Sequence, residues 1–355
     1  MILLATGAVG LESVATEELR GLGLAPAEPV LPGILRLRRP VGGGDLAAAC
    51  RARTVDDLYL EIWAGDRDGL RRRLAAPTWV VAGEVLAAHR DVLAASGRRP
   101  RGRIKTTCFL HGAHRGHGGH GQADLRRQDV ELRMARQLRA AYPAWRLEPE
   151  RPDAEFVAFV SGRSAILALR LTDPGFRHRH YLRAPGALSP TVAAALVRLS
   201  RPGPRDRLLD PCCGGGTILL ERAQAGPYLE LLGGDQSPEA VEVARLNFGN
   251  RHRPWQLHVW DARALPLAPA SVNRVISNLP FGVQISASGG VAAFAAACLR
   301  EAQRVLEPQG RAVFLWPRDV VVAVPELLAP EARLSFDLAG QAVVASVWVR
   351  RSDRD

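Results

Sequence analysis

Two short segments of the chain carry residue types and a spacing that could do chemistry on a flat amine. Residues 210–217 read Asp-Pro-Cys-Cys-Gly-Gly-Gly-Thr, and residues 278–282, about 70 positions later, read Asn-Leu-Pro-Phe-Gly. A glycine turn between a strand and a helix lets backbone N–H groups approach a nucleoside cofactor, because no Cβ keeps the ligand away. In the second segment the Asn278 side-chain oxygen and the Leu279 carbonyl can accept the two N–H groups of an amine, and Phe281 can stack on its ring. The pair predicts a site where an amine meets such a cofactor.

Polar residues at the ends of four predicted strands should position these segments. The first strand, Arg207–Asp210, enters the glycine turn, and a helix follows from Thr217 to Gln224. The next three strands lead to polar residues in the same way: Leu229–Gly233 to Asp235, Leu257–Trp260 to Asp261, and Val272–Ser277 to Asn278. Open α/β sheets bind ligands outside the carboxyl ends of their strands, so these side chains should converge. There Asp235 can accept both ribose hydroxyls of a cofactor, and Asp261 can accept its adenine amine.

The remainder of this part continues the alternation of strand and helix. Ser237 is a predicted N-cap with Pro238 at the first helical position, Val291–Leu306 is a helix, and Arg311–Trp316 is a fifth strand. The tail, 334–338 and 342–349, should form a closing hairpin. Residues 189–355 are therefore predicted to form a doubly wound, mostly parallel α/β sheet with an antiparallel hairpin at its end. A dehydrogenase fits less well, because Leu219 stands where its glycine pattern requires a third glycine.

The first half of the chain reads as mixed α+β structure. Residues 1–60 suggest a small α+β unit, with strands at 2–6 and 33–38, a helix over 10–22, and a second helix that Asp45 caps. In the middle, we expect a helix over 129–141 and two paired strands at 156–160 and 165–171.

Charge is distributed unevenly along the chain. Its formal net charge is +11, and residues 98–183 hold 18 Lys or Arg against 8 Asp or Glu, whereas residues 189–355 hold 18 against 16. A basic middle beside a nearly neutral second half indicates a footprint for a phosphate backbone, although an Arg-rich solvated surface is the alternative.

The composition excludes several other classes of protein. No apolar run is long enough to span a membrane, and the first residues lack the basic leader of a signal peptide, so we expect a cytoplasmic protein. The five cysteines are scattered without a C-x-x-C pair, which argues against disulfides and zinc. The histidines at 111, 114, 117 and 120 invite a metal interpretation, but their neighbours are Gly, Ala and Arg, so we expect a loop near RNA and no metal.

The segments together resemble a known enzyme family. The helix, Pro-Asp turn and paired strands ahead of residue 175 resemble the end of a THUMP domain, an RNA-binding module fused to tRNA-modifying enzymes. The run 176–183, Phe-Arg-His-Arg-His-Tyr-Leu-Arg, is similar to the join between such a domain and its methyltransferase, although Arg179-His180 replaces the usual Arg pair. Asn-Leu-Pro-Phe-Gly looks like the turn of THUMP-containing guanine-N2-methyltransferases of the tRNA acceptor stem. The implied organisation is a ferredoxin-like unit at 1–60, a THUMP domain at 61–175, a linker at 176–188 and a Rossmann-like class I methyltransferase domain at 189–355.

The resemblance also implies a function and a set of site residues. The protein would act as a monomer and transfer a methyl group from S-adenosylmethionine to the exocyclic N2 of a guanine in tRNA, at position 6 or a neighbour. The catalytic turn would be Asn278, Leu279, Pro280 and Phe281. The cofactor would be bound by Asp210, Cys212, Gly214, Gly216, Thr217, Asp235, Gln236, Asp261, Ala262 and Asn278. RNA would contact Arg126, Arg127, Arg177, Arg179 and Arg183. Two alternatives stay open, a ribosomal-RNA guanine-N2-methyltransferase and a non-catalytic RNA-binding protein with a vestigial cofactor pocket.

Overall fold

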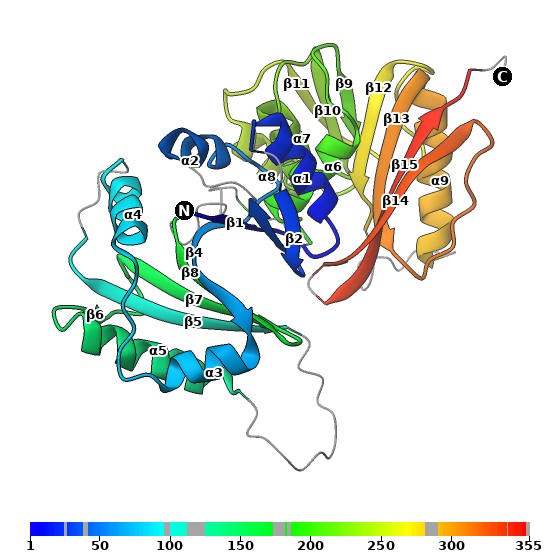
Figure 1. Cartoon of the computed structure of the whole chain (residues 1–355). Coiled ribbons are helices and arrows are strands. Elements are labelled where there is room, and N and C mark those ends of the chain that lie inside the picture. The colour runs from blue at the N-terminus through cyan, green and yellow to red at the C-terminus, as the bar shows by residue number, and fades with distance from the viewer. Residues whose placement is uncertain are drawn as a thin grey trace. The chain divides into compact units, whose positions relative to one another are not determined.

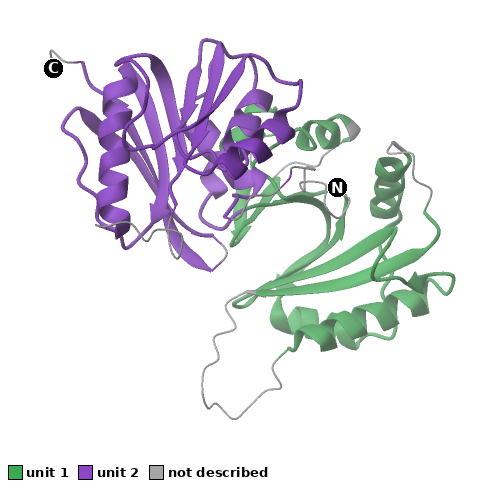
Figure 2. Cartoon of the chain, turned by 180° about the vertical axis from the view of Figure 1, so that it is seen from behind, with its two compact units in different colours: residues 1–7, 16–176 green, residues 8–15, 177–355 purple. Residues whose placement is uncertain are grey.

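The computed structural model places the chain in two compact units (Figures 1 and 2). The residues described are 1–24, 27–37, 42–95, 100–111, 125–172, 182, 186–280, 290–338 and 340–352. The first unit consists of Met1–Gly7 and Thr16–Phe176, and the second of Ala8–Ala15 and Arg177–Asp355. Residues 16–60 thus group with the middle of the chain, and the boundary expected near residue 60 stays a prediction.

The first unit is organised around one mixed sheet. Its elements in chain order are β1 (Leu3–Thr6), α1 (Glu12–Gly21), β2 (Ala27–Leu31), β3 (Ile34–Leu37), α2 (Gly43–Ala49), β4 (Asp57–Asp66), α3 (Arg67–Ala75), α4 (Gly83–Ala95), β5 (Arg103–His111), α5 (Arg127–Ala141), β6 (Arg146–Leu147), β7 (Ala154–Ser161) and β8 (Ser164–Arg170). The strand order is β2-β3-β1-β4-β8-β7-β5-β6. Because β1 pairs with both β3 and β4, the N-terminal residues and the middle of the chain share this sheet.

The hairpin of β7 and β8 confirms the two strands predicted around Ser161–Ser164. Residues 155–160 of β7 are all buried, so the strand is covered on both faces. Helix α5 packs beside β5 on one face (Figure 1). On the other face, Tyr59 and Phe159 form an edge-to-face aromatic pair with ring centroids 5.1 Å apart.

The second unit has the predicted doubly wound sheet. Its elements are α6 (Pro190–Leu199), β9 (Arg207–Asp210), α7 (Thr217–Gln224), β10 (Glu230–Asp235), α8 (Pro238–Phe248), β11 (Trp255–Val259), β12 (Val272–Asn278), α9 (Gly290–Val305), β13 (Leu306–Pro317), β14 (Leu328–Leu338) and β15 (Gln341–Arg350). The strand order is β11-β10-β9-β12-β13-β15-β14, with the first five strands parallel and the closing hairpin antiparallel. Chain order reverses between β9 and β12, which is where such sheets bind ligands.

Successive residues of the central strands enter opposite cores. In β9, Leu208 joins the core that α6, α7 and α8 cover, while Leu209 joins the core that α9 covers (Figure 1). A strand buried on both faces must be apolar without alternation, which is why β9 and β13 read as continuous hydrophobic runs. The start of α1 also belongs here, since Leu11 and Val14 are buried in the first of these cores.

The sequence placed some elements incorrectly or missed them. Helix α2 begins at Gly43 with Gly42 as its N-cap, and Asp45 lies one turn inside, where its carboxylate accepts a 3.0 Å hydrogen bond from the Gly42 N–H. Strand β11 ends at Val259, two residues before Asp261. The elements β2, β4, α3, α4, β5 and β6 were not predicted, because their apolar residues are sparse or share no single period.

Candidate active site

A pocket of about 660 Å³ lies at the carboxyl ends of the parallel strands in the second unit. We call it the strand-end pocket, and it is defined by the four polar residues Asp210, Asp235, Asp261 and Asn278, all of which line it. Six other residues from the predicted site also line it: Cys212, Gly214, Thr217, Gln236, Ala262 and Pro280. The parallel sheet brings these residues together although up to 70 positions separate them.

Asp235 holds the glycine turn in place. Its Oδ2 atom accepts a 2.9 Å hydrogen bond from the Gly214 N–H, and its Oδ1 atom accepts one of 3.0 Å from the Ser237 N–H. Each carboxylate oxygen can accept more than one hydrogen bond, so both oxygens keep capacity for a ligand hydroxyl. Asp235 therefore organises the pocket wall as well as facing the pocket.

The glycines of the turn serve different purposes. Gly214 has φ +50°, and a Cβ added to it would meet nothing within 4 Å, so backbone conformation and an open approach favour glycine there. Gly216 has φ +81°, but a Cβ on it would meet the Ala244 and Phe248 side chains at 3.3 Å. Gly216 was predicted to bind cofactor, yet it is absent from the pocket lining and permits close packing of α7 on α8.

Asn247 ties the glycine turn to the segment that precedes α6. This residue of α8 is 5% exposed, and its Nδ2 atom donates to the Gly215 carbonyl and to the Leu182 carbonyl, each at 2.9 Å. Its Oδ1 atom accepts from the Leu182 N–H at 2.7 Å. Both polar atoms of the amide form hydrogen bonds, so Asn247 fixes the position of the glycine turn from the side of α8.

Asp210 is almost fully buried beneath the pocket. Its Oδ1 atom accepts a 2.7 Å hydrogen bond from the Ser277 hydroxyl and a 3.3 Å one from the Cys212 N–H. Burial raises the pKa of Asp210 to about 7, and the Ser277 hydrogen bond offsets only part of that effect. Near neutral pH the carboxyl group is therefore poised between its two protonation states.

Asp261 is paired in a way that the sequence did not reveal. The Arg263 guanidinium donates to both of its carboxylate oxygens, at 2.7 Å to Oδ2 and 3.0 Å to Oδ1, and holds the pKa of Asp261 below its ordinary value. Because Arg263 also lines the pocket, a ligand amine that binds Asp261 must share the carboxylate with this guanidinium.

The Asn278 turn leaves one acceptor without a partner. Asn278 Oδ1 is buried and has no hydrogen-bond partner among the described residues. The Leu279 N–H donates to the Leu315 carbonyl at 3.1 Å, which fixes the turn on β13. The Leu279 side chain is fully buried and does not line the pocket, although Pro280 does. Phe281 lies outside the described residues.

Behind the glycine turn, Trp260 makes a tight contact with the neighbouring strand. The Trp260 Nε1–H donates to the Pro211 carbonyl at 3.1 Å, and a Cβ on Gly234 would overlap the indole ring. Glycine is therefore required at the end of β10, because any side chain would push the ring away from the glycine turn.

Residues 177–324 match the protein family described as RMKL-like, methyltransferase domain. The second unit carries a methyltransferase domain of this family.

Individual relatives agree with that match. The chain is 31% identical over 189 residues to the mouse protein named tRNA (guanine(6)-N(2))-methyltransferase THUMP3. The aligned region covers 49% of this chain and 37% of the mouse protein. It is 31% identical over 205 residues to the Thermus thermophilus tRNA (guanine(6)-N2)-methyltransferase, covering 57% of this chain and 61% of that protein. The matched part is thus about a third to three fifths of these relatives' lengths. The crystal structure of TrmN from Thermus thermophilus superposes with a TM-score of 0.76 at 26% identity, covering 98% of this chain and 99% of that one.

The cofactor of the methyltransferase domain is S-adenosylmethionine, and the strand-end pocket fits it. The open face at Gly214 admits a ligand against the backbone, Asp235 has lone pairs left for hydroxyl groups, and the pocket volume lies within the usual range for ligands of this size. These features support the predicted cofactor residues, and their individual contacts remain predictions.

Other predicted residues lie elsewhere. Arg126 and Arg127 are exposed at the start of α5 in the first unit, and Arg127 pairs with Glu131 at 2.9 Å. Arg177, Arg179 and Arg183 fall outside the described residues. So do the histidines at 114, 117 and 120; among the residues that the structure describes, no cluster of His, Cys, Asp or Glu could hold a metal ion. No described helix is long and apolar enough to cross a membrane.

Several residues around the methyltransferase pocket were missed. Ser277, Arg263, Phe294 and Leu188 belong to this group, the first as a partner of Asp210 and the others in the pocket lining. Only Ser277 had a usable signal, since it directly precedes Asn278 at the end of β12. The remaining three come from a turn, a helix and a connecting segment, which strand-end reasoning does not reach.

Proposed function

We propose that the protein transfers the methyl group of S-adenosylmethionine to the exocyclic N2 of a guanine in tRNA, at position 6 or a neighbouring position of the acceptor stem. The target base would enter the strand-end pocket beside Asn278. The alternatives are a ribosomal-RNA guanine-N2-methyltransferase and a non-catalytic RNA-binding protein with a vestigial pocket.

The Asn278 side-chain oxygen, which has no hydrogen-bond partner among the residues that the structure describes, carries the proposal. A buried side-chain oxygen without a partner costs free energy, on the order of 1–3 kcal/mol, so its retention calls for a ligand that donates to it. The exocyclic amine of guanine is such a donor. With the Asn278 oxygen accepting one N–H and the Leu279 carbonyl the other, the nitrogen lone pair would be directed away from the turn.

This arrangement suits methyl transfer to a weak nucleophile. S-adenosylmethionine supplies an electrophilic methyl group when bound. The two oxygen acceptors hold the amine and stabilise the positive charge that develops on it, and the fixed turn supplies proximity. The amine can release its proton after transfer, so the site needs no strong base. The target base must be unpaired or flipped out to reach the pocket.

Guanine N2 and tRNA are the choices that the relatives support. The mouse and Thermus proteins are both named for guanine-6 N2 methylation of tRNA. The basic residues between 98 and 183 suit a polyanionic partner. We propose that residues 61–175 act as a THUMP RNA-binding domain, that residues 1–60 form a ferredoxin-like unit, and that residues 176–188 link them to the methyltransferase domain at 189–355. We also propose that the protein works as a monomer in the cytoplasm.

The decisive test is to identify the product. The purified protein would be incubated with labelled S-adenosylmethionine and unmodified tRNA or rRNA, and the digested nucleosides separated by mass spectrometry. N2-methylguanosine mapped to the tRNA acceptor stem is the expected result, and the same nucleoside in rRNA alone would support the ribosomal alternative. N6-methyladenosine or a ring-carbon methyl group would overturn the proposal. Cofactor binding without any product would favour the non-catalytic alternative.

A further inference from the structure

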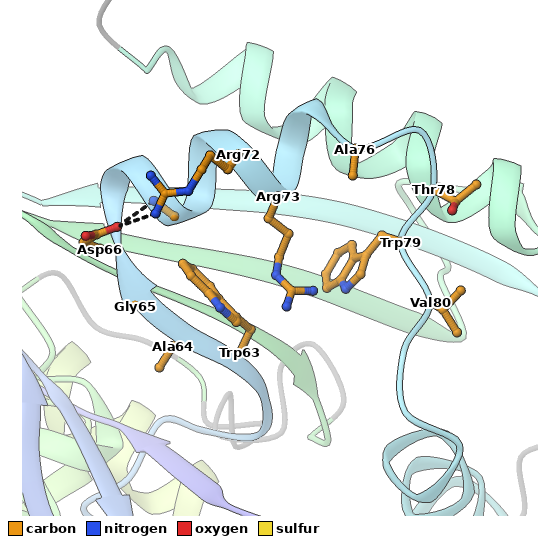
Figure 3. Close-up of a pocket in the computed structure, with 11 residues that line it drawn as sticks. Trp63, Ala64, Gly65, Asp66, Arg72, Arg73, Ala76, Thr78, Trp79 and Val80 are labelled. Atoms are coloured by element: carbon orange, nitrogen blue, oxygen red, sulfur yellow. Dashed lines mark hydrogen bonds and ion pairs between the residues drawn. The ribbon is translucent and has the colours of Figure 1, made fainter.

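A second cavity lies within the first unit and shares no residue with the strand-end pocket. It has a volume of about 610 Å³ and is formed by the end of β4, one side and the C-terminal cap of α3, and the segment Thr78–Val80 (Figure 3). We call it the tryptophan cavity, defined by Trp63, Arg72, Arg73 and Trp79. Its size is within the range of about 300–1,000 Å³ that is usual for small-ligand sites.

Two glycines are placed to accommodate the Trp63 ring. A Cβ on Gly65 would lie 2.5 Å from Trp63 Cζ2, and one on Gly69 would lie 3.0 Å from the same atom and 2.9 Å from Asp66 Oδ1. Neither glycine has a positive φ, so backbone conformation does not explain them. The Trp63 ring accounts for glycine at position 65, and the ring together with the Asp66 carboxylate accounts for glycine at position 69, so a side chain at either position would crowd this wall.

Arg73 adds a cation to the aromatic surface. Its guanidinium carbon lies 5.5 Å from the Trp63 ring centroid, and no carboxylate among the described residues pairs with it. In the view of Figure 3 this guanidinium lies between the rings of Trp63 and Trp79. The neighbouring Arg72 side chain is three quarters exposed. Its distance of 3.9 Å from the Asp66 carboxylate is too long for a hydrogen bond, so its guanidinium can turn toward an anion.

Trp79 supplies a buried hydrogen-bond donor to the same wall. Its side chain is 2% exposed and packs on Phe156, with ring centroids 5.8 Å apart, yet Nε1 is buried and has no hydrogen-bond partner among the described residues. A buried indole N–H normally finds an acceptor. The wall that carries it is fixed, since Gln137 Nε2 donates to the Arg73 and Ala76 carbonyls at 2.8 and 2.6 Å.

We propose that the tryptophan cavity binds one unpaired nucleotide of the RNA substrate. The base stacks on the layer formed by Trp63 and Arg73, a base acceptor receives the Trp79 Nε1–H, and Arg72 contacts the adjoining phosphate. An aromatic face with a guanidinium and a single N–H donor suits a flat, acceptor-bearing base, whereas an acidic peptide would use only the arginines. The inference rests on the proposed function in that RNA is the substrate.

The test compares binding of single-stranded and duplex RNA by the full-length protein. Fluorescence anisotropy would measure the affinity for a labelled strand of about eight nucleotides, alone and annealed to its complement. Trp63→Leu keeps an apolar side chain but removes the stacking face, and it should weaken single-strand binding by roughly 10-fold, while Trp63→Phe should recover most of that affinity. Gly65→Ala, whose added Cβ has atoms of the Trp63 ring as its nearest neighbours, should displace the ring and also weaken single-strand binding.

Arg71 provides a matched control for Arg73. Both lie on α3 and lose one positive charge on mutation to alanine, but Arg71 pairs with Asp68 at 3.2 Å and does not line the cavity. Arg73→Ala should weaken single-strand binding several times more than Arg71→Ala. Equal losses, or wild-type affinity in Trp63→Leu, would overturn the nucleotide site.

The outcomes separate this site from the catalytic proposal. If N2-methylguanosine is the product and the cavity variants bind RNA normally, the cavity assignment is wrong and the catalytic proposal stands. If the variants lose single-strand affinity but the product is a different nucleoside, the cavity assignment stands and the catalytic proposal fails.

Discussion

The strand-end pocket and the tryptophan cavity are built by different means. In the strand-end pocket, charged side chains are tied to backbone groups: Asp235 to the N–H groups of Gly214 and Ser237, and Asp210 to that of Cys212. In the tryptophan cavity, the walls are side chains stacked on side chains, and glycines without positive φ leave room for them. A parallel sheet fixes the first kind of site through its backbone, whereas the second kind depends on individual side chains.

This difference predicts where substitutions act. Changes in the strand-end pocket should alter methyl transfer or cofactor affinity and leave RNA binding intact. Changes in the first unit should alter RNA affinity and leave cofactor affinity intact.

The largest effect is expected at Asn278. Asn278→Ala removes the side-chain acceptor and should lower the rate of methyl transfer by roughly 100- to 1,000-fold, because the charge that develops on the amine loses a preorganised partner. Single-turnover rates at saturating cofactor and RNA would measure this. Asn278→Asp is the control, since a carboxylate oxygen can also accept the N–H and should retain more activity. A rate within tenfold of wild type in Asn278→Ala would remove the residue from the catalytic role.

The next effect is expected at Asp235. Asp235→Ala should weaken S-adenosylmethionine binding by about 10- to 100-fold, because a hydrogen bond to a charged group contributes about 1.5–3 kcal/mol. The Gly214 N–H would also lose its partner, so the turn should loosen. Calorimetric titration would show the loss, and Glu242→Ala on the exposed side of α8 is the control for removal of one negative charge. Unchanged affinity in a folded Asp235→Ala protein would exclude Asp235 from the site.

A smaller effect concerns pH. The pKa of Asp210 in the free protein is raised to about 7 by burial, and a cationic ligand such as S-adenosylmethionine favours the ionised carboxylate. Binding should therefore lower this pKa and release a proton, so affinity should fall as pH drops below about 7, by up to about tenfold per unit, and level off above it. Titrations between pH 5.5 and 8 test this. In Asp210→Asn the dependence should disappear; a profile that persists there must arise from another group.

The strand-end residues could be predicted because the sheet does the positioning. Once β9, β10 and β12 are recognised as parallel strands, their terminal residues must meet at one edge, and all four polar residues line one pocket. The pairing of Asp261 with Arg263 and the burial of Asp210 could not be predicted, because both depend on how turns fold over the strand ends.

The tryptophan cavity left almost no signal in the sequence. Asp66 does cap α3 by accepting from the Gly69 N–H at 2.5 Å, but the helix buries only Leu70 and Leu74, too few for a clear period. Nothing in the sequence marks Gly65 and Gly69, because a sequence does not show which ring a missing Cβ would have touched. The N-terminal segment is a similar case: Leu11 and Val14 fit a helix, but nothing in their spacing assigns them to the core of the second unit.

The smallest effect is expected at the start of α5, and it tests whether the first unit uses charge alone. Arg126 and Arg127 are neighbouring and exposed, but only Arg127 has a described carboxylate partner, Glu131, which also accepts from the Cys108 N–H at 2.9 Å. Each change to alanine removes one positive charge. The difference between the two losses of RNA affinity therefore reports direct contact with a phosphate, separate from the electrostatic field of the whole protein. Arg126→Ala should weaken tRNA binding a few-fold and reduce the slope of log affinity against log salt by about 0.9, while Arg127→Ala should leave the slope unchanged.

Because counterion release vanishes as salt rises, the Arg126→Ala loss should fade at high salt. The loss in Trp63→Leu should persist there, because stacking of a base does not depend on released ions. If the affinity losses of Arg126→Ala and Trp63→Leu both fade at high salt, the first unit binds RNA through its charge alone. The tryptophan cavity would then not be a stacking site for RNA.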